Sequence, residues 1–91
     1  LSKADLSRAS LVHAKFTGAN LTGANLTGAN LFKANLQGIN LSEANLNGAD
    51  LDGANLTGAN LGGAKMKNIR NLDSAIKCKT IFSWGEDNSV C

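Results

Sequence analysis

The stretch from residue 19 to residue 38, ANLTGANLTGANLFKANLQG, repeats one five-residue unit four times. A large apolar residue returns every fifth position from Leu1 to Met66, and these fourteen residues are twelve Leu together with Phe16 and Met66. Ala recurs two positions before each next large residue, with Ile39 and Ile69 as its two replacements. A period of five is neither the 3.6 of an α-helix nor the 2 of a flat β-strand. The repeat therefore predicts an unusual architecture.

The other positions of the unit indicate how the chain turns. Asn or Asp stands directly before the large apolar residue in ten repeats, and Gly follows that residue by two positions in eight. These residue types form turns, because Asn and Asp bond their own backbone and Gly accepts a positive φ. A chain that turns every five residues has to coil, and stacked coils would lie about 4.8 Å apart, as β-strands do. Leu and Ala keep fixed offsets, so both are expected to face one interior.

The alternative for the same stretch is a disordered low-complexity segment, since it is rich in Asn, Gly and Thr. Disordered segments lack apolar residues in strict phase, so we favour the folded interpretation. Each Leu would then stabilise the fold by about 1.5–3 kcal/mol if it is fully buried.

Units such as 19–23 and 54–58 resemble the pentapeptide-repeat family, whose consensus is A-(D/N)-L-x-x, and the resemblance covers about residues 1–74. It implies an all-β fold, a right-handed quadrilateral β-helix with four repeats per coil and a C-terminal cap. At about twenty residues per coil, the chain would form roughly three to four coils. The core stack expected for this fold is represented by Leu11, Phe16, Leu31, Leu36, Leu51 and Leu56.

The repeat slips by one residue after Ile69 and resumes one position late over residues 70–74. We interpret 70–74 as a last partial repeat, and the alternative is a short helix with Asn68 or Asn71 as its N-cap. An inserted residue of this kind is expected to bulge a corner or to begin the end of the coiled region.

Residues 75–91 differ in kind from the repeats and hold the aromatic pair Phe82 and Trp84. An open end of a β-helix exposes apolar core and unpaired backbone groups. We therefore expect residues 1–74 to form the repeat domain and residues 75–91 to cap it, with a turn over 85–88. Alternatively, Trp84 leads a tail that binds a partner.

The two cysteines, Cys78 and Cys91, lie thirteen positions apart in the tail. The tail resembles an ending found in some cyanobacterial and chloroplast family members, with Cys78, Thr80, Gly85 and Cys91 in matching positions, although Ser83-Trp84 replaces their Pro-Asp. A bond between the cysteines would add on the order of 3 kcal/mol. It would also place the protein in an oxidising compartment, the thylakoid lumen or the periplasm. The alternative is two free thiols in a cytoplasmic protein.

The sequence offers little that could perform catalysis. His13 is the one histidine, and two cysteines with one distant histidine cannot form a zinc site. The glycines recur at multiples of five and belong to corners, so they do not form a phosphate-binding loop. Asp50 and Asp52 are close in sequence, but water and Arg70 are their expected neighbours. Because Leu and Ala would fill the interior at every level, we predict no enzyme activity and no cofactor or metal.

Partners would have to bind the outer surface. Residues twenty apart would stack, which places Val12 above Phe32 and makes these two residues, with Trp84, the predicted partner contacts. The net charge is +2, and basic and aromatic residues are not interleaved, so nucleic-acid binding is not expected. No apolar run is long enough to span a membrane.

We therefore predict a non-catalytic structural or protein-interaction module whose partner and oligomeric state the sequence leaves open. One alternative is a DNA mimic that binds gyrase, as some family members do, but those proteins are longer and acidic. Another alternative is a spacer segment of a larger multidomain protein. The sequence begins at Leu1, within a repeat, so we expect a mature or excised piece of a longer precursor.

Overall fold

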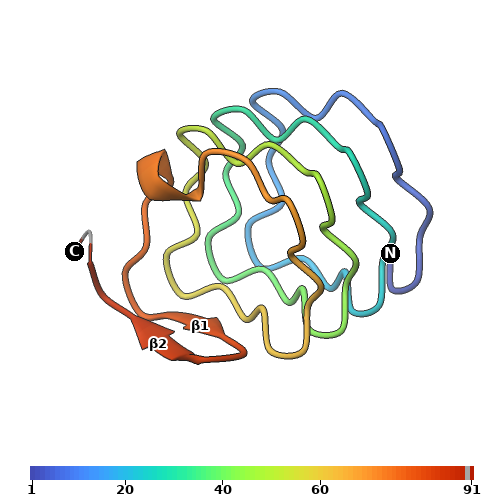
Figure 1. Cartoon of the computed structure of the whole chain (residues 1–91). Helices are drawn as coiled ribbons and strands as arrows, with labels where there is room; N and C mark the ends of the chain where they lie inside the picture. The colour runs from blue at the N-terminus through green and yellow to red at the C-terminus, as the bar shows by residue number, and fades with distance from the viewer. Residues whose placement is uncertain (90) are drawn as a thin grey trace.

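The computed structural model describes residues 1–89 and 91; Val90, which falls within the predicted cap, lies outside the described residues. The chain winds into coils stacked along one axis, and its two ends lie at opposite ends of the stack (Figure 1). The named elements are the 3-10 turn η1 (Leu72–Ser74) and the strands β1 (Thr80–Phe82) and β2 (Gly85–Asp87). Before η1 the chain contributes single bridge residues and turns. Apart from η1, the described chain contains no helix.

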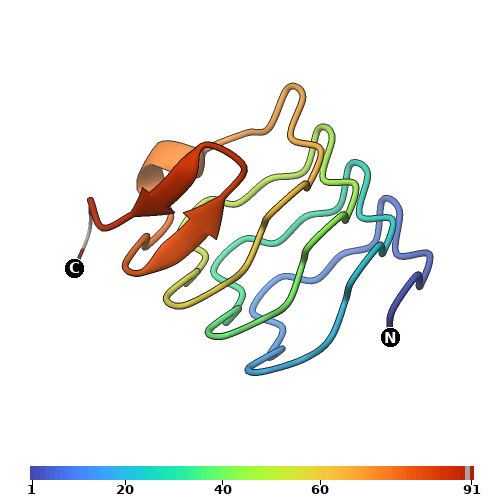
Figure 2. The ribbon, with the colours of Figure 1, turned by 90° about the horizontal axis from the view of Figure 1, so that it is seen from below.

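Parallel bridges join residues twenty apart, from Asp5–Asn25 to Asp50–Arg70. Each repeat therefore lies directly on the repeat four units earlier, as Figure 2 shows for the stacked coils. In repeat 25–29 every N–H group has a partner, which a backbone removed from water requires. In repeat 25–29 the bonds run from Asn25 N to Ala4 O, Leu26 N to Asn45 O, Thr27 N to Asn25 Oδ1, Gly28 N to Asn47 O and Ala29 N to Leu26 O, at 2.7–3.0 Å.

The corner of each repeat is a four-residue turn closed by a bond from the Ala N–H to the Leu carbonyl. Its third residue has a positive φ, such as 66° at Gly28, and a positive φ at this position alone defines a type II turn. Glycine adopts this conformation without steric cost, which explains its recurrence there. Six other residues take the same position at φ between 54° and 61°: Lys3, Arg8, His13, Lys33, Glu43 and Asn68.

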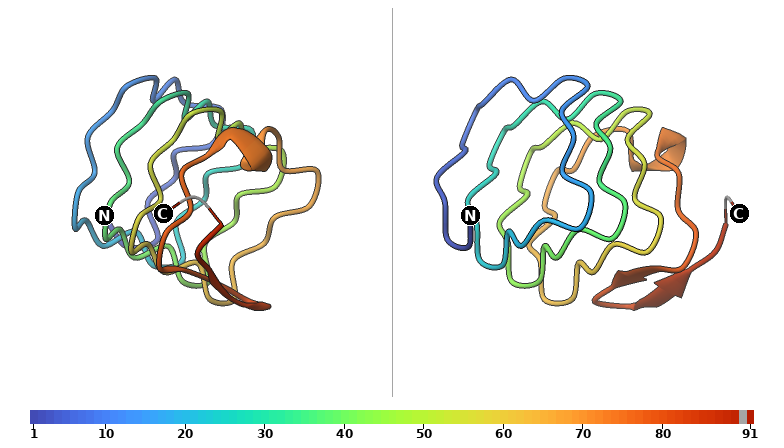
Figure 3. Two further views of the ribbon diagram at one scale, coloured as in Figure 1. Left: turned by 90° about the vertical axis from the view of Figure 1, so that its left-hand side faces the viewer. Right: turned by 180° about the vertical axis from the view of Figure 1, so that it is seen from behind.

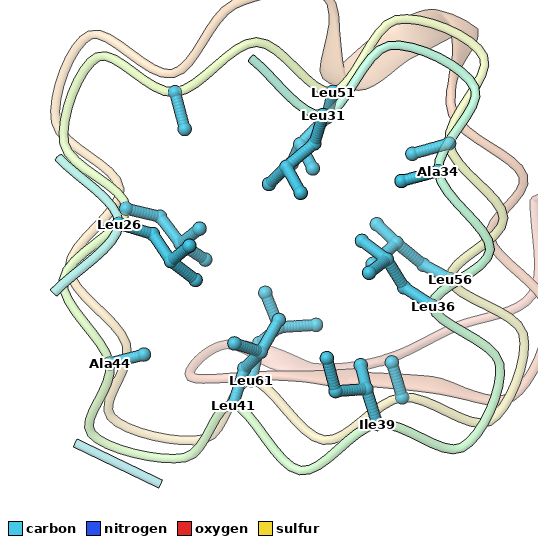
Figure 4. Close-up of a cluster of buried hydrophobic side chains, with 14 of the residues drawn as sticks. Leu26, Leu31, Ala34, Leu36, Ile39, Leu41, Ala44, Leu51, Leu56 and Leu61 are labelled. Carbon is cyan, nitrogen blue, oxygen red and sulfur yellow. The ribbon is translucent and has the colours of Figure 1, made fainter. Parts of the chain in front are cut away.

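Leucines point from four walls of the coil toward one central axis (Figure 4). The predicted core residues Leu31, Leu36, Leu51 and Leu56 are each at most 1% exposed. Leu11 and Phe16 are only half-buried, because they belong to the first coil, whose outer side no described residue covers. Ala and the larger Ile39 fill the space between the leucines, so that the interior is entirely apolar in the middle coils.

The slip in the sequence is absorbed at one corner. Bridges change from a separation of twenty to one of twenty-one at Asn55–Ile76 and Asn60–Ile81, so one residue has been inserted. That residue is Asn71, at φ 61°, and η1 follows it. Ala75 N still donates to Leu72 O at 3.1 Å, the turn bond of an ordinary repeat. The short helix considered as the alternative is limited to the three residues of η1, Leu72–Ser74. The side chain of Asn71 makes no N-cap hydrogen bond to it.

The chain ends in a hairpin in which β1 pairs antiparallel with β2, Thr80 opposite Asp87 and Phe82 opposite Gly85. The predicted turn over residues 85–88 is therefore wrong: the turn is Ser83–Trp84, and Gly85–Asp87 is a strand. Pairing with β1 gives the backbone of residues 85–87 hydrogen bonds that a turn there would forfeit. The hairpin and η1 lie at the same end of the stack, away from the N-terminus (Figure 3).

Candidate interaction surfaces

The described part of the chain encloses no pocket and holds no group of three His, Cys, Asp or Glu side chains placed to bind a metal ion. This follows from the architecture, because Leu and Ala occupy the whole width of each middle coil. Any contact with another molecule therefore involves the outer walls or the two ends of the stack.

Asp50 and Asp52 accept hydrogen bonds from the corner that contains the inserted residue Asn71. Asp50 Oδ1 accepts a bond from Asn71 Nδ2 at 2.9 Å and another from the Asp52 N–H at 3.0 Å. Asp52 Oδ1 accepts from Ser74 Oγ. The bond from Asn71, followed by that from the Asp52 N–H, holds the pKa of Asp50 below its usual range, and Arg70 contributes attraction. Both carboxylates accept hydrogen bonds that hold the corner together, which is not the arrangement of an acid/base pair.

The predicted partner contacts Val12 and Phe32 lie on one wall of the stack. His13 and Lys33, which were not among the predicted contacts, lie beside the Phe32 ring. Val12 is 39% exposed and Phe32 is half-buried. The His13 ring meets Phe32 edge-on, with centroids 5.9 Å apart, and Lys33 Nζ lies 5.3 Å from the Phe32 ring centre. We call Val12, His13, Phe32 and Lys33 the Phe32 patch. The twenty-residue register already implied the neighbourhood, since His13 is nineteen positions from Phe32.

Trp84, the third predicted contact, lies at the C-terminal end of the stack. Its ring stacks on Phe82 with centroids 4.6 Å apart and an interplanar angle of 3°. Phe82 is buried, in the position that Leu61 occupies one coil earlier, whereas Trp84 remains 66% exposed. One face of Trp84 thus covers the end of the core, and the rest of the side chain is accessible.

A further residue of this end, Lys77, was missed by the sequence analysis. It takes the Leu position of the last coil, one coil after Leu56, and is 7% exposed. Its stem fills the apolar position while Nζ donates to Leu72 O at 2.7 Å. This bond satisfies a side-chain nitrogen that burial has removed from most of its contact with water. When the one-residue slip is counted, position 77 falls on the Leu position of the repeat, where an apolar residue is expected. A lysine at this position is the sequence signal that could have identified it.

Cys78 and Cys91 form a disulfide bond. Cys78 lies on the outer side of the last coil, so the bond ties the end of the chain to the coil. Asn88 helps to hold the same segment, since its Oδ1 accepts a bond from the Lys79 N–H at 2.6 Å. The C-terminal end is therefore closed by a covalent bond as well as by packing.

No helix of the described chain has the length and apolar character needed to cross a membrane. The profile of the family described as "Pentapeptide repeats" matches residues 1–38 and 34–70, with eight copies of its unit. This chain belongs to the pentapeptide-repeat family. No curated protein matches its sequence significantly.

Solved structures of other pentapeptide-repeat proteins resemble this one. The protein Rfr23 from the cyanobacterium Cyanothece 51142 is 43% identical, with a TM-score of 0.79 over 82% of this chain and 51% of Rfr23. The protein alr5209 from Nostoc Pcc 7120 is 36% identical, with a TM-score of 0.49, and covers 80% of this chain and 64% of its own. AT2G44920 from the Arabidopsis thaliana thylakoid lumen is 35% identical, with a TM-score of 0.32 over 88% of this chain and 66% of its own. This pentapeptide-repeat chain thus spans about half the length of Rfr23.

Proposed function

We propose that this pentapeptide-repeat protein is a non-catalytic structural module that binds another protein through its outer surface. The observation that carries the proposal is the interior: nine consecutive leucines of the repeat, from Leu21 to Leu61, are each at most 2% exposed. A ligand site needs a cavity, and a filled core leaves only the outer walls and the ends. No enzyme is named among the similar structures.

We further propose that the stacked coils are the right-handed quadrilateral β-helix of the family, with residues 1–74 as the repeat domain and residues 75–91 as its cap. The twenty-residue register and the turn in each five-residue unit support four walls per coil. The TM-score of 0.79 with Rfr23 supports the same arrangement. The coil register continues past the proposed boundary through Ile76 and Ile81, so the cap would include the last coil.

The Phe32 patch is the best-supported contact region on the side walls. Val12 and Phe32 present apolar surface, and Lys33 and His13 stand beside the aromatic ring. The outward positions of the adjacent wall are polar, with Thr17, Gln37 and Thr57 in sequence order. An apolar side chain flanked by carboxylates would complement the patch, because it would bury Phe32 and pair with Lys33.

The test is a pull-down from an extract of the source organism with Phe32→Ser, compared with the unchanged chain. Loss of the apolar contact is expected to reduce recovery of the partner at least about tenfold, the effect of losing one interface anchor. Gln37→Ser, a change at the equivalent position of the next wall, is the matched control and should bind normally. Equal recovery by Phe32→Ser, with an unchanged circular dichroism spectrum, would rule out the patch.

The disulfide supports a location in an oxidising compartment, which we propose is the thylakoid lumen or the periplasm. The spacer alternative stays a prediction, in which the chain would hold two flanking segments of a larger protein at a fixed distance. The gyrase-binding alternative stays a prediction with less support, since the net charge of +2 is opposite to that of a DNA mimic.

A further inference from the structure

One wall of the stack joins the Phe32 patch to a second exposed apolar residue farther along the axis. The bridge residues of this wall lie over one another in successive coils, and they are Lys15, Asn35, Asn55 and Ile76. In Figure 4 it is the wall that carries Ala34, Leu36 and Leu56. Ile76 is 38% exposed in a position that is polar in the three earlier coils. We call this wall, with the Phe32 patch along one edge, the Ile76 wall.

Charge is divided along the Phe32 edge of the Ile76 wall. The cation Lys33 is exposed beside Phe32. Asp52 lies at the same corner one coil later, because Lys33 N donates to Asp52 O at 2.8 Å. Asp73 follows in η1 and is exposed. The edge therefore runs from a cation to two carboxylates in the direction of the C-terminus, and a surface divided in this way can complement a second copy of itself.

Two copies of the Ile76 wall can face one another in two symmetric ways. A twofold axis parallel to the stack would oppose each residue to its own equivalent, Lys33 to Lys33 and Asp52 to Asp52. A twofold axis across the wall makes the two stacks antiparallel. When that axis passes between the coils of Phe32 and Asp52, it brings Lys33 of each copy beside Asp52 of the other. Opposite charges favour this antiparallel arrangement, and like charges disfavour the parallel one.

The apolar residues of the wall find suitable neighbours in the same antiparallel register. Lys15 of each copy faces Ile76 of the other, and a lysine stem can pack on an apolar side chain while its ammonium group stays in water. Phe32 faces the corner at Gly53, which has no side chain of its own and is covered by the stem of Lys33. The ring therefore meets carbon atoms of the other copy and loses contact with water.

The two asparagines of the wall also match, because Asn35 of each copy faces Asn55 of the other. Among the described residues, Asn35 Oδ1 accepts one hydrogen bond, from the Gln37 N–H at 3.1 Å. Asn55 Oδ1 accepts two, from the N–H and the hydroxyl of Thr57. An amide oxygen can accept two hydrogen bonds, so Asn35 Oδ1 has room for one from Asn55 Nδ2 of the other copy.

We propose that the Ile76 wall is a homodimer interface, in which two copies pack antiparallel and Lys33 of each copy pairs with Asp52 of the other. This inference rests on the proposed function, because it names a second copy of the chain as the protein that the Phe32 patch binds. The same wall is used in both copies, so assembly stops at two. The wall is no wider than 30 by 24 Å, below the about 800 Å² per partner of standard interfaces, so a weak and concentration-dependent dimer is expected.

Sedimentation velocity of the 91-residue chain from about 1 µM to about 1 mM would measure the dimer. Lys33→Asp places two carboxylates together at each of two equivalent contacts and is expected to raise the dissociation constant roughly tenfold. The double variant Lys33→Asp with Asp52→Lys reverses both charges and should restore the affinity. Arg8→Asp is the matched control and should dimerise normally. Arg8 takes the same position at another corner, with φ 59° against 54° at Lys33, and its stem also lies over a glycine of the next coil.

Ile76→Lys gives an independent test, because it places a second cation opposite Lys15 of the other copy. It should weaken the dimer and leave the circular dichroism spectrum of the monomer unchanged. Ile81→Lys makes the same change at the bridge position of the next wall, where Ile81 is 44% exposed. That wall lies outside the contact, so Ile81→Lys should dimerise normally.

The homodimer and the proposed function can fail separately. A monomer at every concentration, open-ended assembly, or equal affinity of Lys33→Asp and the unchanged chain would each overturn the homodimer. Suppose that the chain is monomeric throughout, and that the pull-down recovers a different protein that Phe32→Ser loses. The proposed function would then be supported and the homodimer overturned. A dimer that Phe32→Ser and Lys33→Asp both weaken, and that Arg8→Asp does not, supports both.

Discussion

The first and the last coil of the described residues differ in what covers them. At the C-terminal end, Phe82 takes the last Leu position, Trp84 stacks on it, and a hairpin and a disulfide hold the chain in place. In the first coil, no other described residue covers the outer side, so that Leu1 is 70% exposed and Leu6 is half-buried. A repeat satisfies its own hydrogen bonds only where it has neighbours on both sides, so each end needs something that the repeat itself does not contain.

The comparison separates the stability of the middle from that of the ends. Core positions in the middle coils are closed on every side, whereas equivalent positions in the first coil are half-buried. The same substitution should therefore have different consequences along one wall. The stability of the C-terminal end should depend on individual bonds, the disulfide and the Asn71–Asp50 hydrogen bond, each of which a single substitution removes.

The largest effect is expected for Leu46→Ala, since Leu46 is fully buried and its loss leaves a cavity. The free energy of unfolding should fall by about 2–5 kcal/mol. Leu6→Ala, at the same wall in the first coil, should cost under about half as much, because Leu6 is already partly exposed. Urea unfolding followed by circular dichroism measures both. Equal losses would show that the first coil is as closed as the middle.

The next effect concerns the covalent bond of the closed end. Cys78→Ser should lower the free energy of unfolding by about 3 kcal/mol, the value expected for a short closed loop. Intact mass of the unchanged chain should rise by about 2 Da on reduction, which establishes that the bond was present. Equal melting temperatures of the variant and the oxidised chain would mean that packing alone closes this end.

The smallest effect is a dependence on pH. Folding lowers the pKa of Asp50, chiefly through Asn71, so this stabilisation is complete above the unfolded value of about 3.9 and is lost as the pH falls through the lower folded value. The protection of amides around η1 from hydrogen exchange, relative to the unfolded chain at the same pH, should thus decrease below about pH 4. Asp50→Asn keeps an oxygen for the Asp52 N–H but removes the charge, and it should abolish this pH dependence.

Asp5, in the first coil, supplies the contrast for the pH measurement. The pKa of its carboxyl is also lowered, but by the hydroxyl and N–H of Ser7, two residues away. Its protonation should loosen one local turn without changing exchange elsewhere. An acid effect on η1 that persists in Asp50→Asn would show that another group controls the closed end.

Most of the body was predictable because its signal recurs. The Leu and Ala periods indicate the core, and the Asn and Gly positions indicate the corners, since each residue type meets a requirement that every repeat shares. The end of the chain was less predictable because its features occur once. Lys77 is polar in an apolar position, and residues 85–87 pair with β1 although Gly85 resembles a turn residue. The grouping of His13 and Lys33 with Phe32 required the coil register.

The five-residue unit with its twenty-residue register also turns distance along the chain into direction around an axis. Removing one unit would rotate every later surface residue by a quarter turn while leaving the core pattern intact. Asp5 and Lys15, for example, lie on opposite walls because ten residues, half a coil, separate them. Asn71 shows that one extra residue can be absorbed at a corner without disturbing the walls that follow. A change in the length of such a chain therefore moves the later surface residues to different walls. A deletion of five residues can be used to test which wall a partner binds.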